Sequence, residues 1–294
     1  MAYCAFNSII AFFTNPFIIL NHGMDLVQGR NVSPRERILS TLGLFNIFYQ
    51  LTLITNDLVL FLWNELYFSD KVHTTFSMIL LFTIFSSFWF TACLCGFYYV
   101  SIVSFKHPLF MQLKQRMLEV VNWMLALSVL IALTISFPVA WNISKPITNP
   151  GTANSTSLEE GISQISPHYL LIASIFGCGV PLVLVGAADA IVLKSLFTNA
   201  RLLLRNAGGM SVQSVDASMA AARTITSLLF LYLCFYLSVI SLFLNIVLLG
   251  STWFPLCVTV IYSYSPIQSV ILILGSPKLK GALLGIFTRL MGQL

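Results

Sequence analysis

The chain has 294 residues, of which 57% are hydrophobic and only 9% are charged. Ordinary soluble domains carry about 25% charged residues, so this composition excludes a soluble globular enzyme, and its apolar character excludes intrinsic disorder. The net charge of +5 comes from basic residues scattered over short segments, a pattern that argues against nucleic-acid binding.

Seven stretches are apolar over the roughly 20 residues that a helix needs to span a bilayer. An open strand would leave backbone groups unpaired in lipid, and the stretches lack the alternation of barrel strands. The sequence therefore predicts an all-α membrane protein, a single seven-transmembrane-helix domain over residues 1–294. In chain order the predicted spans cover residues 3–24, 39–63, 73–104, 118–141, 168–193, 224–250 and 253–275.

The basic residues predict the orientation of this bundle. Three alternate connections and the tail 276–294 hold 13 of the 15 Lys and Arg residues, whereas the opposite side holds only Lys71 and Lys145. Because cytosolic loops are enriched in Lys and Arg, we expect the N-terminus outside the cell and the C-terminus in the cytosol.

The polar segment 142–167 then lies outside the cell. It carries two glycosylation sequons, which begin at Asn142 and Asn154. Because Asn142 directly follows a predicted span, we expect Asn154 to be the main acceptor and Asn142 the lesser one.

Motifs for catalysis or metal binding are not evident. The four histidines are far apart, the six cysteines lack metal-site spacing, and the chain has no G-x-S-x-G motif and no Gly-rich phosphate loop. We therefore expect a protein that is not an enzyme and that needs no metal and no cofactor.

Seven helices, an outside N-terminus and basic inner loops suggest a G-protein-coupled receptor. The rhodopsin-like signatures are missing, since Phe105-Lys106-His107 follows the third predicted helix where such receptors have Asp-Arg-Tyr. These missing motifs weaken a rhodopsin-like chemosensory or lipid receptor, which stays open as an alternative. A seven-helix small-molecule transporter is a second one, although the internal symmetry that such a fold requires is not evident.

Motifs along most of the chain resemble those of the bitter taste receptors (taste receptor type 2). In the first half these are Asn15-Pro16-Phe17-Ile18, Asp25-Leu26-Val27-Gln28-Gly29-Arg30, Arg37-Ile38-Leu39, Trp89, Phe97-Tyr98-Tyr99, Phe105, Phe110 and Leu113-Lys114-x-Arg116. In the second half they are Leu193-x-Ser195-Leu196, Asp216-Ala217-Ser218, the run Gln268–Gly275 and Lys278-Leu279-Lys280. Each motif is weak alone, but their order and spacing are specific, so the sequence is identified as a divergent member of this family.

Several positions depart from the pattern of the family. The family has Arg, Lys, His, His and Asn where this chain has Asn46, Ser101, Asn199, Gln268 and Ser276. These positions belong to the family's inner-half polar network and cytosolic switch, so the resemblance predicts the architecture but not the details of activation.

The resemblance implies a multi-pass plasma-membrane receptor. Its partners would be a bitter small-molecule agonist, a heterotrimeric G protein with a gustducin-like or inhibitory-class Gα and its βγ subunits, and membrane lipid. The expected ligand-binding residues are Asp57, Trp89, Cys93, Val258, Ile261 and Tyr236. The expected activation network is Asn15, Asn46, Gln268 and Ser269, and the expected G-protein contacts are Lys114, Arg116, Ser195 and Leu196.

Two acids lie within predicted spans, where insertion of a charge costs about 2.5–3.5 kcal/mol. Asp189 lies five residues before Lys194, so we expect its side chain to reach the nearby membrane interface. Asp57 lies 11 residues after Asn46 and about 16 Å nearer the outside on the same helix face. We expect Asp57 to face Trp89, so that carboxylate and ring together hold a cationic agonist.

Overall fold

The computed structural model describes residues 2–29, 32–67, 69–102, 115–144, 164–205, 212–244, 246–247 and 250–291. For some of these only the backbone is described, namely residues 2–4, 26, 64, 144, 164, 196–197, 199–205, 212–218, 287 and 290–291.

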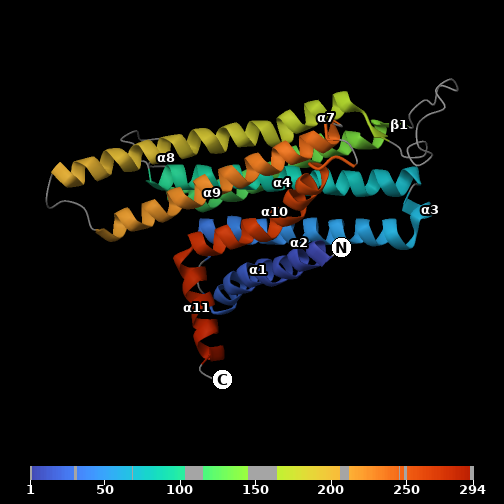
Figure 1. The fold of residues 1–294 in the computed structure, drawn as a ribbon. Helices are drawn as coiled ribbons and strands as arrows, with labels where there is room; N and C mark the ends of the chain where they lie inside the picture. The colour runs from blue at the N-terminus through green and yellow to red at the C-terminus, as the bar shows by residue number, and fades with distance from the viewer. Residues whose placement is uncertain are drawn as a thin grey trace.

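Long helices lie side by side and make up nearly all of this described chain (Figure 1). In its first half these are α1 (Ala2–Val27), α2 (Pro34–Leu62), the short α3 (Asn64–Tyr67), α4 (Asp70–Ile102) and α6 (Met117–Ser136), which continues into the 3-10 turn η1 (Phe137–Trp141). In its second half they are α7 (Pro167–Ser174), the π turn η2 (Ile175–Gly179), α8 (Val180–Arg205), α9 (Val212–Phe243), α10 (Phe254–Gly275) and α11 (Pro277–Met291).

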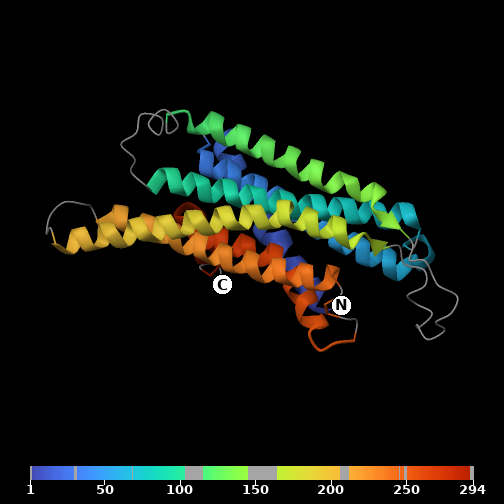
Figure 2. The same cartoon turned by 90° about the horizontal axis from the view of Figure 1, so that it is seen from above.

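Two-residue strands, β1 (Ile143–Ser144) and β2 (Gln164–Ile165), pair antiparallel at one end of the bundle. Seen from above, α4 runs through the middle of the helix layers (Figure 2). α11 leaves the bundle at a steep angle at the opposite end (Figure 1). The tail 276–294, for which the sequence analysis predicted no helix, thus contains one.

Six helical segments of the described chain are long and apolar enough to cross a membrane, which confirms the expected helical membrane architecture in that part. They are Pro34–Leu62, Asp70–Ile102, Met117–Trp141, Pro167–Ser195, Met219–Phe243 and Phe254–Gly275. α1 packs against α2 and α10 and is not among these six segments of the described chain. A seventh span and the expected orientation therefore stay predictions.

The joint between η2 and α8 shows how local sequence shapes one helix. Pro181 has no backbone N–H, and its ring opposes the carbonyl group four residues earlier, which is that of Gly177. The chain widens into a π turn there, with the Val180 N–H donating to the Ile175 carbonyl. α4 packs closely against this turn, because a Cβ atom on Gly177 would lie 2.3 Å from the Phe85 ring.

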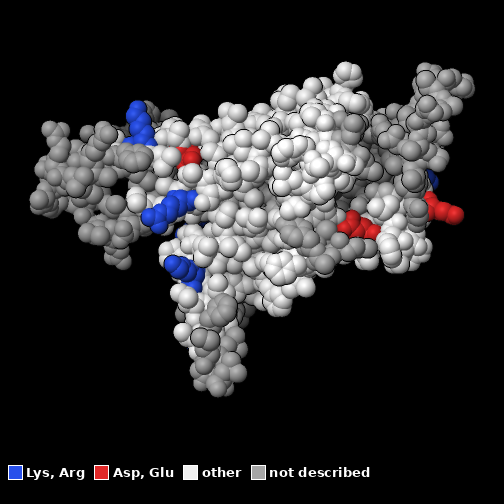
Figure 3. Space-filling model, viewed as in Figure 1, with Lys and Arg blue, Asp and Glu red and all other residues white. Residues whose placement is uncertain are grey.

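The charged residues divide between the two ends of the bundle. On the face drawn in Figure 3, Lys and Arg gather toward the end from which α11 leaves, whereas most Asp and Glu lie at the other end. We call these the basic end and the acidic end. The expected orientation, which rests on the same asymmetry, would put the basic end in the cytosol.

Candidate functional site

A buried polar cluster joins α1, α2 and α10. The Asn46 side-chain amide donates to Asn15 Oδ1 at 3.1 Å, and the Asn15 amide donates to Ser265 Oγ at 3.4 Å. Ser265 in turn donates to the Asn46 carbonyl oxygen at 3.3 Å. All three residues are at most 1% exposed, so each helix supplies hydrogen-bond partners that the other two need.

The other two residues of the expected network lie elsewhere. Ser269 Oγ pairs with Thr14 Oγ1 of α1 at 2.6 Å, next to the first cluster. Gln268 points instead toward α4 and α9, where its amide donates to the Tyr232 hydroxyl and to Thr91 Oγ1. The expectation of one network was wrong for Gln268, because neighbouring residues on a helix point about 100° apart.

Tyr232 is the centre of this second cluster. Its hydroxyl hydrogen-bonds to Thr91 Oγ1 and donates to the Ser87 carbonyl at 3.2 Å, and Ser87 Oγ also pairs with the Tyr264 hydroxyl at 2.7 Å. The Tyr232 ring packs edge-on against Phe88 and Tyr264, with centroids 4.5 and 5.4 Å away. The cluster therefore links α4, α9 and α10 through both polar and aromatic contacts.

Asp57 lies near the acidic end of α2 and contacts α10. Its Oδ2 accepts a hydrogen bond from the Tyr262 hydroxyl at 2.5 Å. The Phe45 ring of α2 contacts both Phe82 and Phe90 of α4, with centroids 5.7 and 4.8 Å away. Residue 45 is therefore level with the middle of residues 82–90 of α4, the segment that contains Trp89. Asp57 lies 12 residues, or about 18 Å, farther along α2. The expected pairing of Asp57 with Trp89 was therefore wrong.

Trp89 and Cys93 lie on a face of α4 that is turned toward α6. Cys93 is 4% exposed, and its Sγ lies 3.3 Å from Ser128 Oγ of α6. Trp89 precedes Cys93 by one helical turn and so shares this face, and its indole nitrogen is buried without a partner in the described chain. Cys93 thus packs between α4 and α6. A different face of α4 carries Ser87 and Thr91, which contact the Tyr232 cluster.

The remaining expected ligand residues lie on α9 and α10. Tyr236 of α9 is half-buried, and its hydroxyl lies 3.8 Å from the position that a Cβ atom on Gly179 would occupy. Ile261 is half-buried, and its carbonyl accepts a hydrogen bond from the Tyr49 hydroxyl at 2.9 Å. Val258 is half-buried on the same helix.

Asp189 is buried rather than extended to the interface. It is 4% exposed, and both of its oxygens accept from Thr226 Oγ1 of α9, at 2.9 and 3.1 Å. The expectation that it reaches the interface was wrong, because α9 covers the face of α8 on which it lies.

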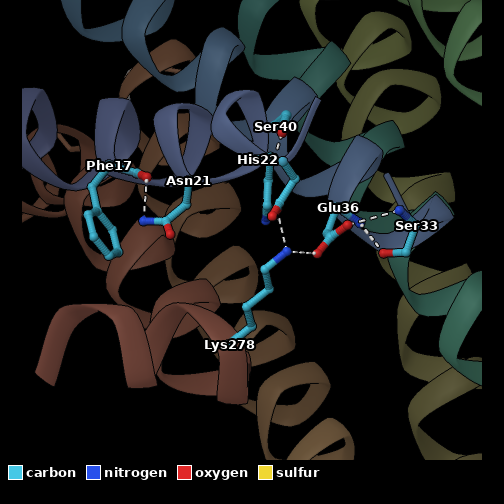
Figure 4. Close-up of polar contacts among 8 residues, drawn as sticks. Phe17, Asn21, His22, Ser33, Glu36, Ser40 and Lys278 are labelled. Carbon is cyan, nitrogen blue, oxygen red and sulfur yellow. Dashed lines mark hydrogen bonds and ion pairs between the residues drawn. The ribbon is translucent and has the colours of Figure 1, made fainter. Parts of the chain in front are cut away.

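At the basic end, Lys278 joins α11 to α1 and α2 (Figure 4). Its ammonium group pairs with Asp25 and, at 2.7 Å, with Glu36, while Glu36 also forms a capping box with Ser33 at the start of α2. Burial of Lys278 opposes its charge, but its hydrogen bonds to the two carboxylates outweigh this effect and raise its pKa. Asp25 and Lys278 belong to two of the family motifs in the sequence, but the motifs did not predict that they pair.

Arg35 makes a further connection at this end. Its Nη2 donates to the Gly275 carbonyl at the end of α10, at 2.8 Å, and its guanidinium carbon lies 5.4 Å from the centre of the Tyr98 ring. One residue of α2 thus contacts the ends of α4 and α10.

The expected G-protein contacts and glycosylation sites are described only in part. Arg116 is exposed directly before α6, and Ser195 is half-buried in α8, where the backbone of Leu196 is also helical. Lys114 and Asn154 lie outside the described residues. Asn142 follows η1, and its side-chain amide donates to the Pro138 carbonyl at 2.8 Å. The described residues contain no group of His, Cys, Asp and Glu side chains arranged to hold a metal ion.

Apolar helices joined by buried polar clusters define a multi-pass membrane protein, and comparisons with known proteins specify its class. The family model described as Taste receptor protein (TAS2R) matches residues 1–291, so the chain belongs to the taste receptor type 2 family. The chain is 27% identical over 278 residues to taste receptor type 2 member 40 of Gallus gallus, covering 94% of this chain and 89% of the relative.

Two further relatives agree. Taste receptor type 2 member 119 of Rattus norvegicus is 31% identical over 271 residues, covering 90% of this chain and 78% of the relative. Taste receptor type 2 member 39 of Homo sapiens is 29% identical over 282 residues, covering 93% of this chain and 82% of the relative. The family is one of plasma-membrane receptors rather than enzymes, and the resemblance drawn from the motifs is confirmed.

Proposed function

We propose that this protein is a bitter taste G-protein-coupled receptor that activates a gustducin-like or inhibitory-class Gα protein. The match of the taste receptor model to nearly the whole chain carries the proposal. The rhodopsin-like and transporter alternatives have no comparable support.

The proposal includes a seventh span and an orientation. α1 has 26 residues, which at 1.5 Å per residue is about 39 Å, longer than the roughly 30 Å hydrocarbon core. We propose that α1 crosses the membrane with its N-terminus outside. An N-terminal epitope tag should then stain intact cells, and a C-terminal tag should stain only permeabilised cells. The reverse result would contradict this orientation.

Agonists would bind toward the acidic end, which is the outer end in this orientation. Asp57 supplies a carboxylate there, and Tyr262 holds it with a hydrogen bond that leaves acceptor capacity for a second donor. We propose that Asp57 binds the cationic group of an agonist, such as a protonated amine, with Tyr262 in the position that the sequence analysis gave to Trp89. Val258 and Ile261 belong to the same helix as Tyr262 and would contact the apolar part of the agonist.

The buried clusters supply a route from agonist to G protein. A ligand shifts a conformational equilibrium only by its differential affinity for two states, and polar clusters between helices allow two packings with different hydrogen-bond partners. The Asn46 and Tyr232 clusters together join five helices in this way, namely α1, α2, α4, α9 and α10. The exposed residues at the basic end, including Arg116, would contact Gα.

The experiment is a calcium assay in cells that express the receptor with a chimeric Gα and are challenged with cationic and neutral bitter compounds. Agonist-dependent calcium that requires the Gα supports the proposal, whereas tracer flux without Gα would contradict it. Asp57→Asn should lower potency for cationic agonists about tenfold, or about 1.4 kcal/mol, and spare neutral ones. Tyr262→Phe is the matched control, because it keeps the charge. Equal losses for both agonist classes in Asp57→Asn would show that Asp57 maintains the fold.

A further inference from the structure

A groove of about 490 Å³ opens between α1, α2 and α6 at the basic end. Its lining includes Ile19, His22, Gly23, Arg37, Asn122 and Leu125. It is far from Asp57, at the opposite end of α2. The agonist site and the proposed Gα contacts do not use it.

One side of the groove is polar. Arg37 Nη1 donates to Asn122 Oδ1 at 3.1 Å, which engages one of the five N–H donors of the guanidinium. His22 is 2% exposed, and its Nδ1 pairs with Ser40 Oγ at 2.8 Å. Its Nε2 is buried without a partner among the described residues. A buried ring nitrogen without a partner is uncommon in folded proteins, so this side of the groove is suited to a polar ligand group.

The surrounding charges make Arg37 the dominant charge of the groove. His22 is near Asp25, Glu36, Arg35 and Lys278. Lys278 pairs with both carboxylates. These two acids and two bases balance in charge. Among the described residues the Arg37 guanidinium bonds to the neutral amide of Asn122, so its positive charge makes the groove as a whole favour an anion.

The other side of the groove is apolar and has room. Ile19 and Leu125 line it, and a Cβ atom on Gly23 would meet nothing within 4 Å. An inorganic anion would leave this surface uncovered, whereas a hydrocarbon chain would pack along it through van der Waals contacts.

The two sides lie at different depths. Arg37 is three residues, about 4.5 Å, from the start of α2. Ile19 is eight residues from the end of α1, and Leu125 is eight residues from the start of α6, so both lie about 12 Å from their helix ends. Charge near the helix ends and apolar surface deeper inside match the order of headgroup and acyl chain in a leaflet.

We propose that this groove binds an anionic glycerophospholipid, with the headgroup phosphate on Arg37 and His22 and one acyl chain along Ile19 and Leu125. Basic pockets between transmembrane helices bind anionic lipid headgroups in this manner. The proposal requires only that the protein spans the membrane, so it stands or falls independently of the agonist and of Gα.

The test is a lipid titration of the purified receptor in detergent, with bound lipids counted by native mass spectrometry. The probes are phosphatidylserine, phosphatidylcholine of the same acyl chains, and water-soluble glycerophosphoserine. The wild type should bind phosphatidylserine about fivefold more tightly than phosphatidylcholine, and glycerophosphoserine should not compete. Equal affinities for the two lipids would overturn the proposal. Effective competition by glycerophosphoserine would show a soluble-anion site and would overturn it as well.

Two variants test the two sides of the groove separately. Arg37→Gln should abolish the preference for phosphatidylserine, whereas the matched control Arg223→Gln, at an exposed arginine of α9, should keep it. Gly23→Leu adds an apolar side chain at a residue that lines the groove and leaves the polar lining residues unchanged. It should weaken binding of both lipids, whereas Gly281→Leu, where space is also open, should not. If Arg37→Gln fails to fold, Gly23→Leu still tests the lipid site. Wild-type lipid affinity of the Gly23→Leu variant would refute the site.

Discussion

Replacement of Tyr232 by Phe tests whether the cluster of α4, α9 and α10 holds the bundle together through its hydroxyl group. The variant keeps the ring, whose edge-on contacts with Phe88 and Tyr264 need no oxygen. It removes the group that accepts from the Gln268 amide and donates to the Ser87 carbonyl. The change is therefore confined to hydrogen bonds.

The magnitude follows from what the deletion leaves behind. Hydrogen bonds between transmembrane helices contribute on average about 0.6 kcal/mol and at most about 1.7 kcal/mol, whereas a buried polar group left without a partner costs about 1–3 kcal/mol. Gln268 is fully buried, and among the described residues its amide group then keeps only a long bond of 3.4 Å to Thr91. We expect Tyr232→Phe to lower the free energy of unfolding by about 1–2 kcal/mol.

The assay is thermal or denaturant unfolding of the purified receptor, with Tyr49→Phe as the matched control. Tyr49 donates one hydrogen bond, to the Ile261 carbonyl, so we expect its loss to cost less. Adding Gln268→Leu to Tyr232→Phe should recover part of the loss, because both polar partners are then gone. Equal effects of the two Tyr→Phe changes, or strict additivity with Gln268→Leu, would refute the reasoning.

Three further predictions concern the basic end, a close helix contact and the loop 142–167. Lys278→Gln should lower stability by about 1 kcal/mol, as measured by unfolding. Because the pKa of Lys278 is raised, its ion pairs persist below the usual lysine pKa and are lost only as pH rises through the raised value. The cost should thus be equal at pH 7 and pH 9, and a cost that vanishes at pH 9 would contradict the assignment. Gly177→Ala should destabilise by about 1–3 kcal/mol through its clash with Phe85, whereas Gly23→Ala should be neutral or stabilising. Asn154→Gln should remove most of the endoglycosidase-sensitive mass shift on a gel, and an unchanged shift would contradict glycosylation there.

The apolar stretches of the sequence were sufficient to predict the helices, because the length of apolar sequence is a property of each segment alone. Motif order was likewise sufficient to identify the family. Hydropathy did not predict α11 or the extension of α9 to Val212, because it detects the part of a helix that lies in lipid and not the polar turns beyond it. The π turn before Pro181 depends on local chemistry together with the close approach of Phe85.

The contacts between helices required the tertiary structure. The sequence indicated that Asn15 and Asn46 belong to one polar network, and they are bonded to each other. It also grouped Gln268 with them and placed Asp57 opposite Trp89, and the structure contradicts both. Which side chains meet depends on the rotation of each helix and on its axial offset against its neighbours. Burial of aromatic and polar groups from several helices at once determines those two quantities, and no single segment contains that information.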